Sequence, residues 1–210
     1  KNIDNDVEDF TAYNFMYDDL KIEKNKISIF HHNYLKDNWE DIVEDEIKEI
    51  VKSGLYDECE SIHATIFSED MSQCYLFKDL IDRYDKSNKW IIYILNKNNF
   101  EIDCLELLYE HCKTNDCYIF YFNNKGVTHN TATTKSWRDY MIYFNISKYK
   151  EALYKLTEYD AYGVDLHPHP YLHYSGNFWW SKSSHIKKLK TDTLHLEYFN
   201  NKNNIEIGFP

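Results

Sequence analysis

The stretch from His167 to Trp180, HPHPYLHYSGNFWW, brings three histidines, a Ser-Gly-Asn turn and two adjacent tryptophans into fourteen residues. His167 and His169 are two positions apart and His173 follows four later, so the first two could reach one zinc ion from an extended segment. The two intervening prolines stiffen that segment, and no cysteine or carboxylate within it completes a ligand set. We therefore favour hydrogen bonding from a loop, to the backbone or to a ligand, over a metal site.

The second half of this stretch, SGNFWW, has two interpretations. Trp179 and Trp180 could be large core side chains of a buried strand. Alternatively, their indole faces could form a platform for pyranose rings, with Asn and His side chains as partners for the sugar hydroxyls. We adopt the platform as the prediction.

Three charged residues elsewhere could take part in chemistry. Lys125 follows a strongly apolar run, and its ammonium either is solvated or contacts a diphosphate. Arg138 either makes a local salt bridge or adds a second positive charge there. Asp165 either caps a turn or acts as a general base. Gly126 follows Lys125, Gly163 lies two residues before Asp165, and Gly176 is in the Ser-Gly-Asn turn, which suggests that backbone approaches a ligand at these places.

Short apolar runs alternate with amphipathic helical patterns along the chain. Asn38 is a predicted N-cap for the first helix and Gly54 its C-terminal stop, while Asn99 is a predicted cap further along. The predicted strands are 27–31, 61–67, 90–95, 117–122 and 161–165, and the predicted helices are 39–53, 76–84, 100–112, 137–144 and 148–159.

This alternation predicts an α/β fold with a wound, mostly parallel sheet. In such sheets ligands bind beyond the carboxyl ends of the strands. That rule selects four segments as candidate ligand contacts, namely 31–33, 68–70, 123–126 and 165–167.

Composition limits the classes of partner and compartment. The formal net charge is -11, and such an acidic chain repels phosphate backbones, so nucleic acid is excluded as the predicted partner. The five cysteines are odd in number and show no CxxC spacing, which indicates a reducing, cytoplasmic environment. No apolar run approaches the ~18 residues needed to span a membrane.

Five motifs occur in order along the chain: SGLYD from Ser53, KGV from Lys125, WRDYM from Trp137, GVD from Gly163 and SGNFWW from Ser175. Together they resemble a family of short glycosyltransferase-like proteins with a GT-A-type fold, found in bacteria and large DNA viruses. The resemblance runs from about Ile27 to Phe199.

The resemblance implies a single GT-A-like domain over 1–210, with a nucleotide-binding half at about 27–125 and an acceptor half at about 126–210. It implies that the end of the first strand lies near the base and ribose of the donor, and that the loop after the central strand lies near the diphosphate. With Arg138, the expected donor-side residues are His31, His32, Asn123, Asn124, Lys125 and Gly126. The expected acceptor-side residues are His173, Ser175, Gly176, Asn177, Trp179, Trp180 and Glu197.

One departure from the broader GT-A pattern concerns the metal. Those enzymes usually carry Asp-x-Asp just after the central strand, where it holds a divalent cation on the diphosphate. Here that place reads FNNK, from Phe122 to Lys125. Dependence on Mn²⁺ or Mg²⁺ is therefore left open, and no metal ligand is predicted.

We predict a hexosyltransferase-type enzyme that moves a sugar from a nucleotide donor, UDP-linked in our first choice, to a glycan or other hydroxyl acceptor. Asp165 is the predicted base. One alternative is a catalytically weak or inactive module that only binds nucleotide or glycan, and another is a His-dependent metal hydrolase.

Overall fold

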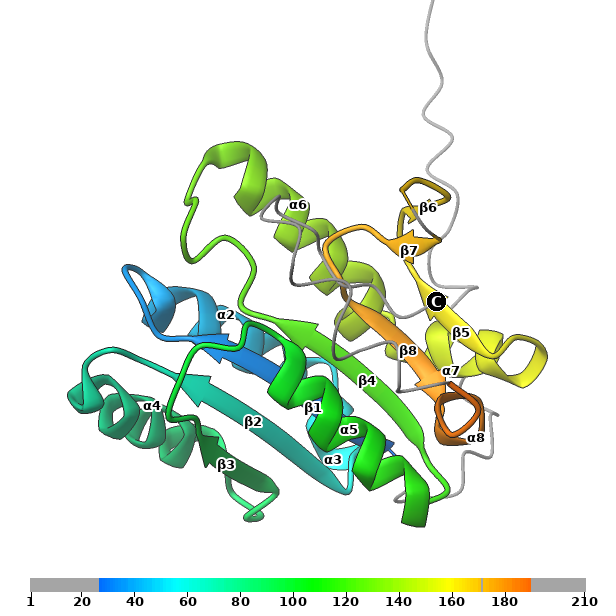
Figure 1. Ribbon diagram of the computed structural model, residues 1–210, viewed down its shortest axis with the longest axis horizontal. Helices are drawn as coiled ribbons and strands as arrows, with labels where there is room; N and C mark the ends of the chain where they lie inside the picture. Colours follow the sequence, from blue (N-terminus) through cyan, green and yellow to red (C-terminus); the bar gives the residue numbers. More distant parts are fainter. Residues whose placement is uncertain (1–26, 171, 190–210) are drawn as a thin grey trace, which may run out of the picture.

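A computed structural model describes residues 27–170 and 172–189 of the chain. Its central element is a six-stranded sheet with the order β3-β2-β1-β4-β8-β5, in which β1 to β4 are mutually parallel (Figure 1). β8 runs antiparallel to both of its neighbours. The strands are β1 (Ile27–Tyr34), β2 (Ser61–Phe67), β3 (Trp90–Ile94), β4 (Tyr118–Asn123), β5 (Ala161–Gly163) and β8 (Trp179–Lys182).

Helices cover both faces of this sheet, and a two-stranded ribbon of β6 and β7 stands beside it. α5 and α8 pack on one face, and α2, α3, α4, α6 and α7 pack on the other. The predicted α/β class with a mostly parallel sheet is confirmed. The remaining elements are α2 (Trp39–Lys52), α3 (Leu55–Glu58), α4 (Met71–Tyr84), α5 (Ile102–Thr114), α6 (Ala132–Ile142), the π-helix η1 (Tyr143–Ser147), α7 (Tyr149–Glu158), α8 (Ser183–Ile186), β6 (Leu166–His167) and β7 (His173–Tyr174).

α2 forms where the apolar spacing predicts it and buries that face against β1 and β2. The helix stops where Gly54 adopts φ 85°, a left-handed conformation that a glycine reaches without steric cost. Asn38 occupies the N-cap position, but its side chain makes no capping hydrogen bond.

α5 and α6 begin at places that differ from the prediction. Phe100 has φ 55° and is 65% exposed, so α5 starts only at Ile102 and Glu101 takes the N-cap position. α6 starts at Ala132, five residues before the predicted start at Trp137, because the Thr131 hydroxyl accepts a hydrogen bond from the Thr134 amide and caps the helix.

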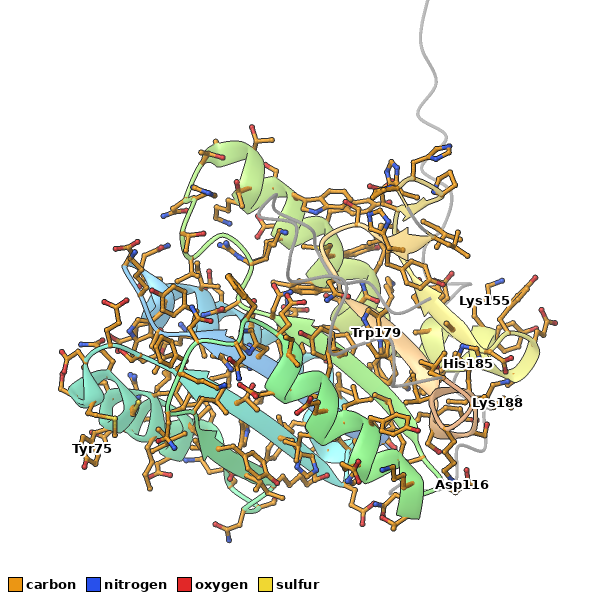
Figure 2. The ribbon with its side chains drawn as sticks, in the orientation of Figure 1. Tyr75, Asp116, Lys155, Trp179, His185 and Lys188 are labelled. Carbon is orange, nitrogen blue, oxygen red and sulfur yellow. The ribbon has the colours of Figure 1, made fainter. Side chains whose placement is uncertain are left out.

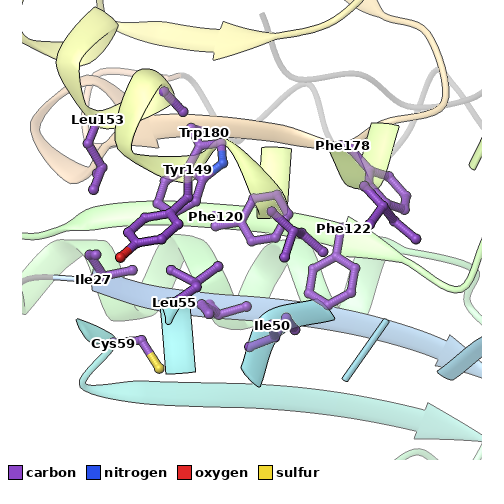
Figure 3. Close-up of a cluster of buried hydrophobic side chains, with 14 of the residues drawn as sticks. Ile27, Ile50, Leu55, Cys59, Phe120, Phe122, Tyr149, Leu153, Phe178 and Trp180 are labelled. Atoms are coloured by element: carbon purple, nitrogen blue, oxygen red, sulfur yellow. The ribbon is translucent and has the colours of Figure 1, made fainter. Parts of the chain in front are cut away.

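The aromatic core is built from alternate residues of β4 and β8 that point to opposite faces. On one face Trp180 stacks on Phe120 with ring centres 4.8 Å apart, and its Nε1 donates to the Asn145 carbonyl. Figure 3 shows these rings packed with side chains from β1 and the helices that cover this face. On the opposite face Trp179 stacks on Tyr121 at 5.3 Å.

The two tryptophans are therefore core residues, and the prediction of a sugar platform is wrong for both. Trp179 is 2% exposed and Trp180 is fully buried, so neither indole can offer a face to a ligand. Figure 2 places Trp179 inside the molecule at β8, whereas Tyr75 stands on the outer side of α4. The physical reason is that β8 is an inner strand of the sheet, covered by helices on both faces.

We expect Trp180→Ala to lower the free energy of unfolding by about 3–5 kcal/mol, because it removes a stacked ring and leaves a cavity. Urea denaturation measures the change. The matched control is Tyr75→Ala on α4, where the side chain is 67% exposed and the expected cost is within about 0.5 kcal/mol. Equal costs for both variants would contradict the assignment of Trp180 to the core.

Candidate functional site

The strand order reverses between β1 and β4, and we call the region beyond the carboxyl ends of these two strands the crevice. From β1 the chain moves outward to β2 and β3, then returns to place β4 on the other side of β1. Ligands of open α/β sheets bind at such a reversal of strand order. Because β8 is antiparallel, its first residues lie at this same edge, beside the end of β4.

The loop after β4 is fastened to the end of β1 by one side chain. Asn124 Oδ1 accepts from the Tyr34 amide at 3.2 Å, and Asn124 Nδ2 donates to the Tyr34 carbonyl at 2.9 Å. Both ends of this amide are used, so Asn124 positions the loop. This corrects its prediction as a side chain that contacts the donor.

A carboxyl group that the sequence analysis missed lies at the centre of the site. Glu101 Oε1 accepts from Asn123 Nδ2 at 2.6 Å, and Glu101 Oε2 accepts from Asn177 Nδ2 at 2.5 Å. One predicted donor-side residue and one predicted acceptor-side residue thus meet at a single carboxyl group. The ammonium of Lys125 is a further electrostatic partner of that group.

Burial has the largest effect on the pKa values of Glu101 and Lys125. It raises the pKa of Glu101 to about 7, against the opposing effects of Asn177, Lys125 and Asn123. It also lowers the pKa of Lys125, which Glu101 partly restores. The Tyr121 hydroxyl is buried beside the same carboxyl group, where it also opposes the rise of the Glu101 pKa, and burial raises the pKa of Tyr121 itself further above the usual range. Near neutral pH the Glu101 carboxyl is therefore close to its titration midpoint.

The Ser-Gly-Asn motif is a tight turn that delivers Asn177 to this centre. The Asn177 amide donates to the Tyr174 carbonyl at 3.1 Å, and Gly176 adopts φ 81° at the third position of the turn. A Cβ on Gly176 would lie 2.3 Å from the Met141 sulfur on α6. A glycine is therefore required here because any side chain would clash with α6.

Arg138 and Gly126 stabilise the conformation of the loop after β4. Arg138 is 4% exposed, and its Nη1 donates to the Lys125 carbonyl at 2.8 Å. Gly126 has φ 95°, and a Cβ there would meet Thr134 at 2.9 Å and Arg138 at 3.0 Å. These contacts correct the prediction that Arg138 offers a second charge to the ligand and that Gly126 allows close approach of a ligand.

The two histidines of β1 point to opposite faces of the sheet. His31 is fully buried, stacks on Phe122 at 3.9 Å and places its Nε2 3.1 Å from Glu46 Oε2. Burial lowers the pKa of His31 and raises that of Glu46, so both are driven toward their neutral forms. This placement in the core corrects the prediction that His31 contacts the base or ribose.

His32 faces the side of α5, with its Nδ1 3.2 Å from the Thr65 hydroxyl. It is 6% exposed and lies on the strand that leads into the crevice.

Asp165 lies at the carboxyl edge of β5 and is exposed to solvent. Its carboxylate is 3.0 Å from His167 Nε2, and its carbonyl accepts from the Ser175 amide. The backbone of the predicted base is therefore adjacent to the turn that carries Asn177. His173 lies on β7, with its ring centre 6.0 Å from that of His167. Glu197 lies outside the described residues.

A shallow pocket of about 270 Å³ opens next to the crevice, between the carboxyl ends of β1 and β2. Tyr34, Lys36 and Trp39 line one side of it, and Ser68 and Asp70 line the other. The pocket includes the segment 68–70 that the strand-edge rule selected. It offers both an aromatic ring and charged groups to a ligand that enters from the edge.

The residues at the end of β4 do not fit a divalent cation. Asn124 is committed to the backbone of Tyr34, and an ammonium from Lys125 is present instead of a second carboxylate. Within 27–170 and 172–189 no three His, Cys, Asp or Glu side chains gather as a metal-binding group. None of the helices described is both long and apolar enough to cross a membrane.

Comparison with known families matches residues 27–205 to a family described as a domain of unknown function, DUF8361. The chain belongs to this family. No curated protein matches the sequence. Among solved structures, one match is the crystal structure of 4-diphosphocytidyl-2C-methyl-D-erythritolsynthase from Anaerococcus prevotii DSM 20548. That match has 11% identity and a TM-score of 0.43, and it covers 83% of this chain and 77% of that chain. Similarity at this level does not transfer an activity to the family member described here.

We expect the stability contributed by neutral His32 to be lost as the pH falls. Burial lowers the pKa of His32 from 6.5 to about 4, so the unfolded chain takes up the proton first and stability falls between these values. Relative to His32→Asn, the wild type should lose of the order of 1–3 kcal/mol of unfolding free energy over this range. Chemical denaturation at a series of pH values measures the difference, with His129→Asn at an exposed position as the control. Parallel pH curves for wild type and His32→Asn would contradict the prediction.

Proposed function

We propose that the protein is a glycosyltransferase that uses a nucleotide-sugar donor, UDP-linked in our first choice, and a glycan or other hydroxyl acceptor. The observation that carries the proposal is the meeting of the loop after β4 and the Ser-Gly-Asn turn at Glu101. A transferase must hold donor and acceptor within bonding distance, and here the two segments assigned to them share one carboxyl group.

The sequence motifs support a GT-A-like interpretation of the same fold. Two of the five motifs that carry the resemblance, KGV and SGNFWW, lie at the end of β4 and the start of β8, at one edge of the sheet. Under this proposal the pocket between β1 and β2 takes the base and ribose of the donor. Tyr34 would supply an aromatic surface, and Asp70 an acceptor for hydroxyl or amide groups.

The diphosphate would then lie over the loop that begins at Asn123. Lys125 is the cation of this loop, and the Arg138 contact to the Lys125 carbonyl holds its backbone in place. An ammonium can balance the charge of a diphosphate as a point charge. In this proposal Lys125 takes over part of the role that a divalent cation has in enzymes with Asp-x-Asp.

Acceptor binding is assigned to the surface formed by β7 and the following turn. Both tryptophans of SGNFWW are buried, and so is Asn177, whose amide is committed to Glu101 and Trp179. This corrects the prediction that Asn177 contacts the acceptor and leaves His173 and Ser175 as the hydroxyl partners on this side. Asp165 is held beside this turn through the Ser175 amide. Its exposed carboxylate, paired with His167, is our candidate for the base that removes the proton of the attacking hydroxyl.

The experiment that tests the proposal is a thermal-shift screen with uridine diphosphate and nucleotide sugars. Binding to the native state raises stability by RT ln(1 + [L]/Kd), about 2.7 kcal/mol at a hundredfold excess over Kd. Lys125→Ala should weaken binding of the diphosphate by about 1.5–3 kcal/mol, the range for hydrogen bonds to charged groups. Lys113→Ala on the exposed side of α5 is the control and should bind as the wild type does.

The donor assignment fails if no nucleoside diphosphate or nucleotide sugar shifts the melting temperature. It also fails if chelator abolishes binding while Lys125→Ala leaves it intact, because a metal would then do what we assign to Lys125. Binding without donor hydrolysis or transfer would instead favour a module that holds the nucleotide without turnover.

We expect Asp165→Asn to leave donor binding nearly unchanged and to reduce turnover by about 10²–10⁴-fold, because the amide keeps the shape but not the basicity. Release of nucleoside diphosphate in the presence of acceptor measures turnover. Asp82→Asn on α4 is the control, since that carboxylate is exposed and pairs only locally with Lys78. Wild-type turnover in Asp165→Asn would make Asp165 a structural residue of the turn.

A further inference from the structure

The orientation of the Asn177 amide is fixed by its second hydrogen bond. Trp179 Nε1 donates to Asn177 Oδ1 at 2.8 Å, and an indole N–H can only donate. Asn177 Oδ1 must therefore face the indole, which directs Nδ2 to Glu101 Oε2 at 2.5 Å. Oε2 is committed to accepting a hydrogen bond, whatever the charge of the carboxyl group.

A proton taken up by Glu101 is consequently favoured on Oε1, the oxygen that faces Asn123. In the ionised state Asn123 Nδ2 donates to Oε1 at 2.6 Å. When Oε1 carries a hydrogen, two donors face each other, and the Asn123 amide relieves the conflict by turning over so that its Oδ1 accepts. Among residues 27–170 and 172–189, Asn123 makes no comparable second side-chain bond, so this side chain is the one that responds.

Protonation changes what the loop offers to an anion in three ways. It turns the Asn123 NH₂ group away from Glu101 and makes it available to another acceptor. It removes a negative charge from beside the diphosphate position. It also removes the attraction that the Glu101 carboxylate exerts on the Lys125 ammonium. All three changes strengthen binding of an anionic group, so the neutral form of Glu101 is the form that binds it best.

We propose that the site takes up one proton at Glu101 when it binds the diphosphate of a nucleotide sugar, so that donor binding is coupled to protonation. The proton comes from solvent, converts the carboxylate to the carboxylic acid and returns to solvent when the diphosphate leaves. This inference rests on the proposed function, since it takes the diphosphate as the anion. Glu101 is a positioning residue in it, because it acts through Asn123 and Lys125.

Among the titratable groups around the site, Glu101 is the one whose protonation state changes near neutral pH. Its pKa is raised to about 7 by burial. The pKa of His32 on β1 is about 4, that of Cys104 on α5 is about 12, and that of Tyr121 on β4 is raised above its usual range. The pKa of Lys125 on the loop after β4 is lowered from 10.5, so measurements are kept below about pH 8.

The test uses UDP-glucose, because both phosphates of its diphosphate are esterified and do not titrate in this range. Isothermal titration calorimetry at about pH 6 and about pH 8, in two buffers of different ionisation enthalpy, gives the affinity and the number of protons taken up. We expect affinity to be about tenfold higher at the lower pH and uptake to approach one proton at the higher pH. These measurements use the wild-type chain alone.

Glu101→Gln imitates the protonated state, because its carbonyl can accept from Asn177 while its NH₂ donates to Asn123 Oδ1. We expect it to bind UDP-glucose about equally at both pH values, as tightly as the wild type does at the lower one, with no proton uptake. The matched control is Glu110→Gln, an exposed position on the same helix, which should keep the wild-type pH dependence. A purely structural role would weaken binding in Glu101→Gln at both pH values.

A measurement without ligand separates failure of this inference from failure of the proposed function. A carboxyl group with a raised folded-state pKa loses stability as the pH rises from 4.5 through about 7, so wild type should lose unfolding free energy relative to Glu101→Gln. If UDP-glucose binds without proton uptake, the inference is overturned and the proposed function stands. If UDP-glucose does not bind at either pH, the proposed function and the coupling are both overturned, while the stability curves still report the proton on Glu101.

Discussion

The structure of the crevice depends on a carboxyl group that is withdrawn from water and satisfied by two amides. A buried carboxylate is costly unless donors surround it, and here Asn123 and Asn177 supply one N–H to each oxygen. These residues belong to different segments, the end of β4 and the turn before β8. The cost of burying Glu101 is thus offset only when the parallel part of the sheet and its antiparallel extension are both in place.

The aromatic side chains next to Glu101 hold its hydrogen-bond partner Asn177 in one orientation. Trp179 and Tyr121 stack against each other, and the indole N–H of Trp179 determines which way the Asn177 amide faces. A buried aromatic pair therefore sets the hydrogen-bond direction of a polar residue at the sheet edge. This coupling explains why the motif SGNFWW combines small, polar and very large residues. The glycine allows the turn, and the asparagine donates a hydrogen bond to Glu101. The tryptophans pack in the core and hold the turn and the asparagine in position.

Local periodicity was sufficient to predict β1 to β5 and most of the longer helices, because the apolar runs of β1, β2 and β4 and the amphipathic face of α2 have only one simple interpretation. The strand-edge rule also selected the loop at Asn123 and the turn at Asp165. It missed Glu101 because Asn99 was a plausible cap and the helix was expected to start at Phe100, two residues before the actual start of α5. Applied to the predicted strand 90–95, the same rule covers residues 96–99 and stops short of Glu101, so no local signal singled out this residue. The position of β8 inside the sheet was not predictable from a four-residue strand, since the pairing of Trp179 and Trp180 with two distant strands is a tertiary property, and so the tryptophans were assigned to a surface.

The insertion of β8 between β4 and β5 has a consequence for the order in which the molecule can assemble. β1 to β4 are complete once the chain has reached Asn123, and the ladders that join β3 to β2, β2 to β1 and β1 to β4 contain no later residue. β5 has no partner in the sheet until β8 arrives, some fifteen residues further along. The chain is synthesised from the N-terminus, so one edge of β4 stays unpaired until β8 has been made. β5 can become part of the sheet only after β8 has paired with β4. β8, from Trp179 to Lys182, is the last strand to pair in the sheet. The crevice therefore forms in the same step in which the sheet becomes complete.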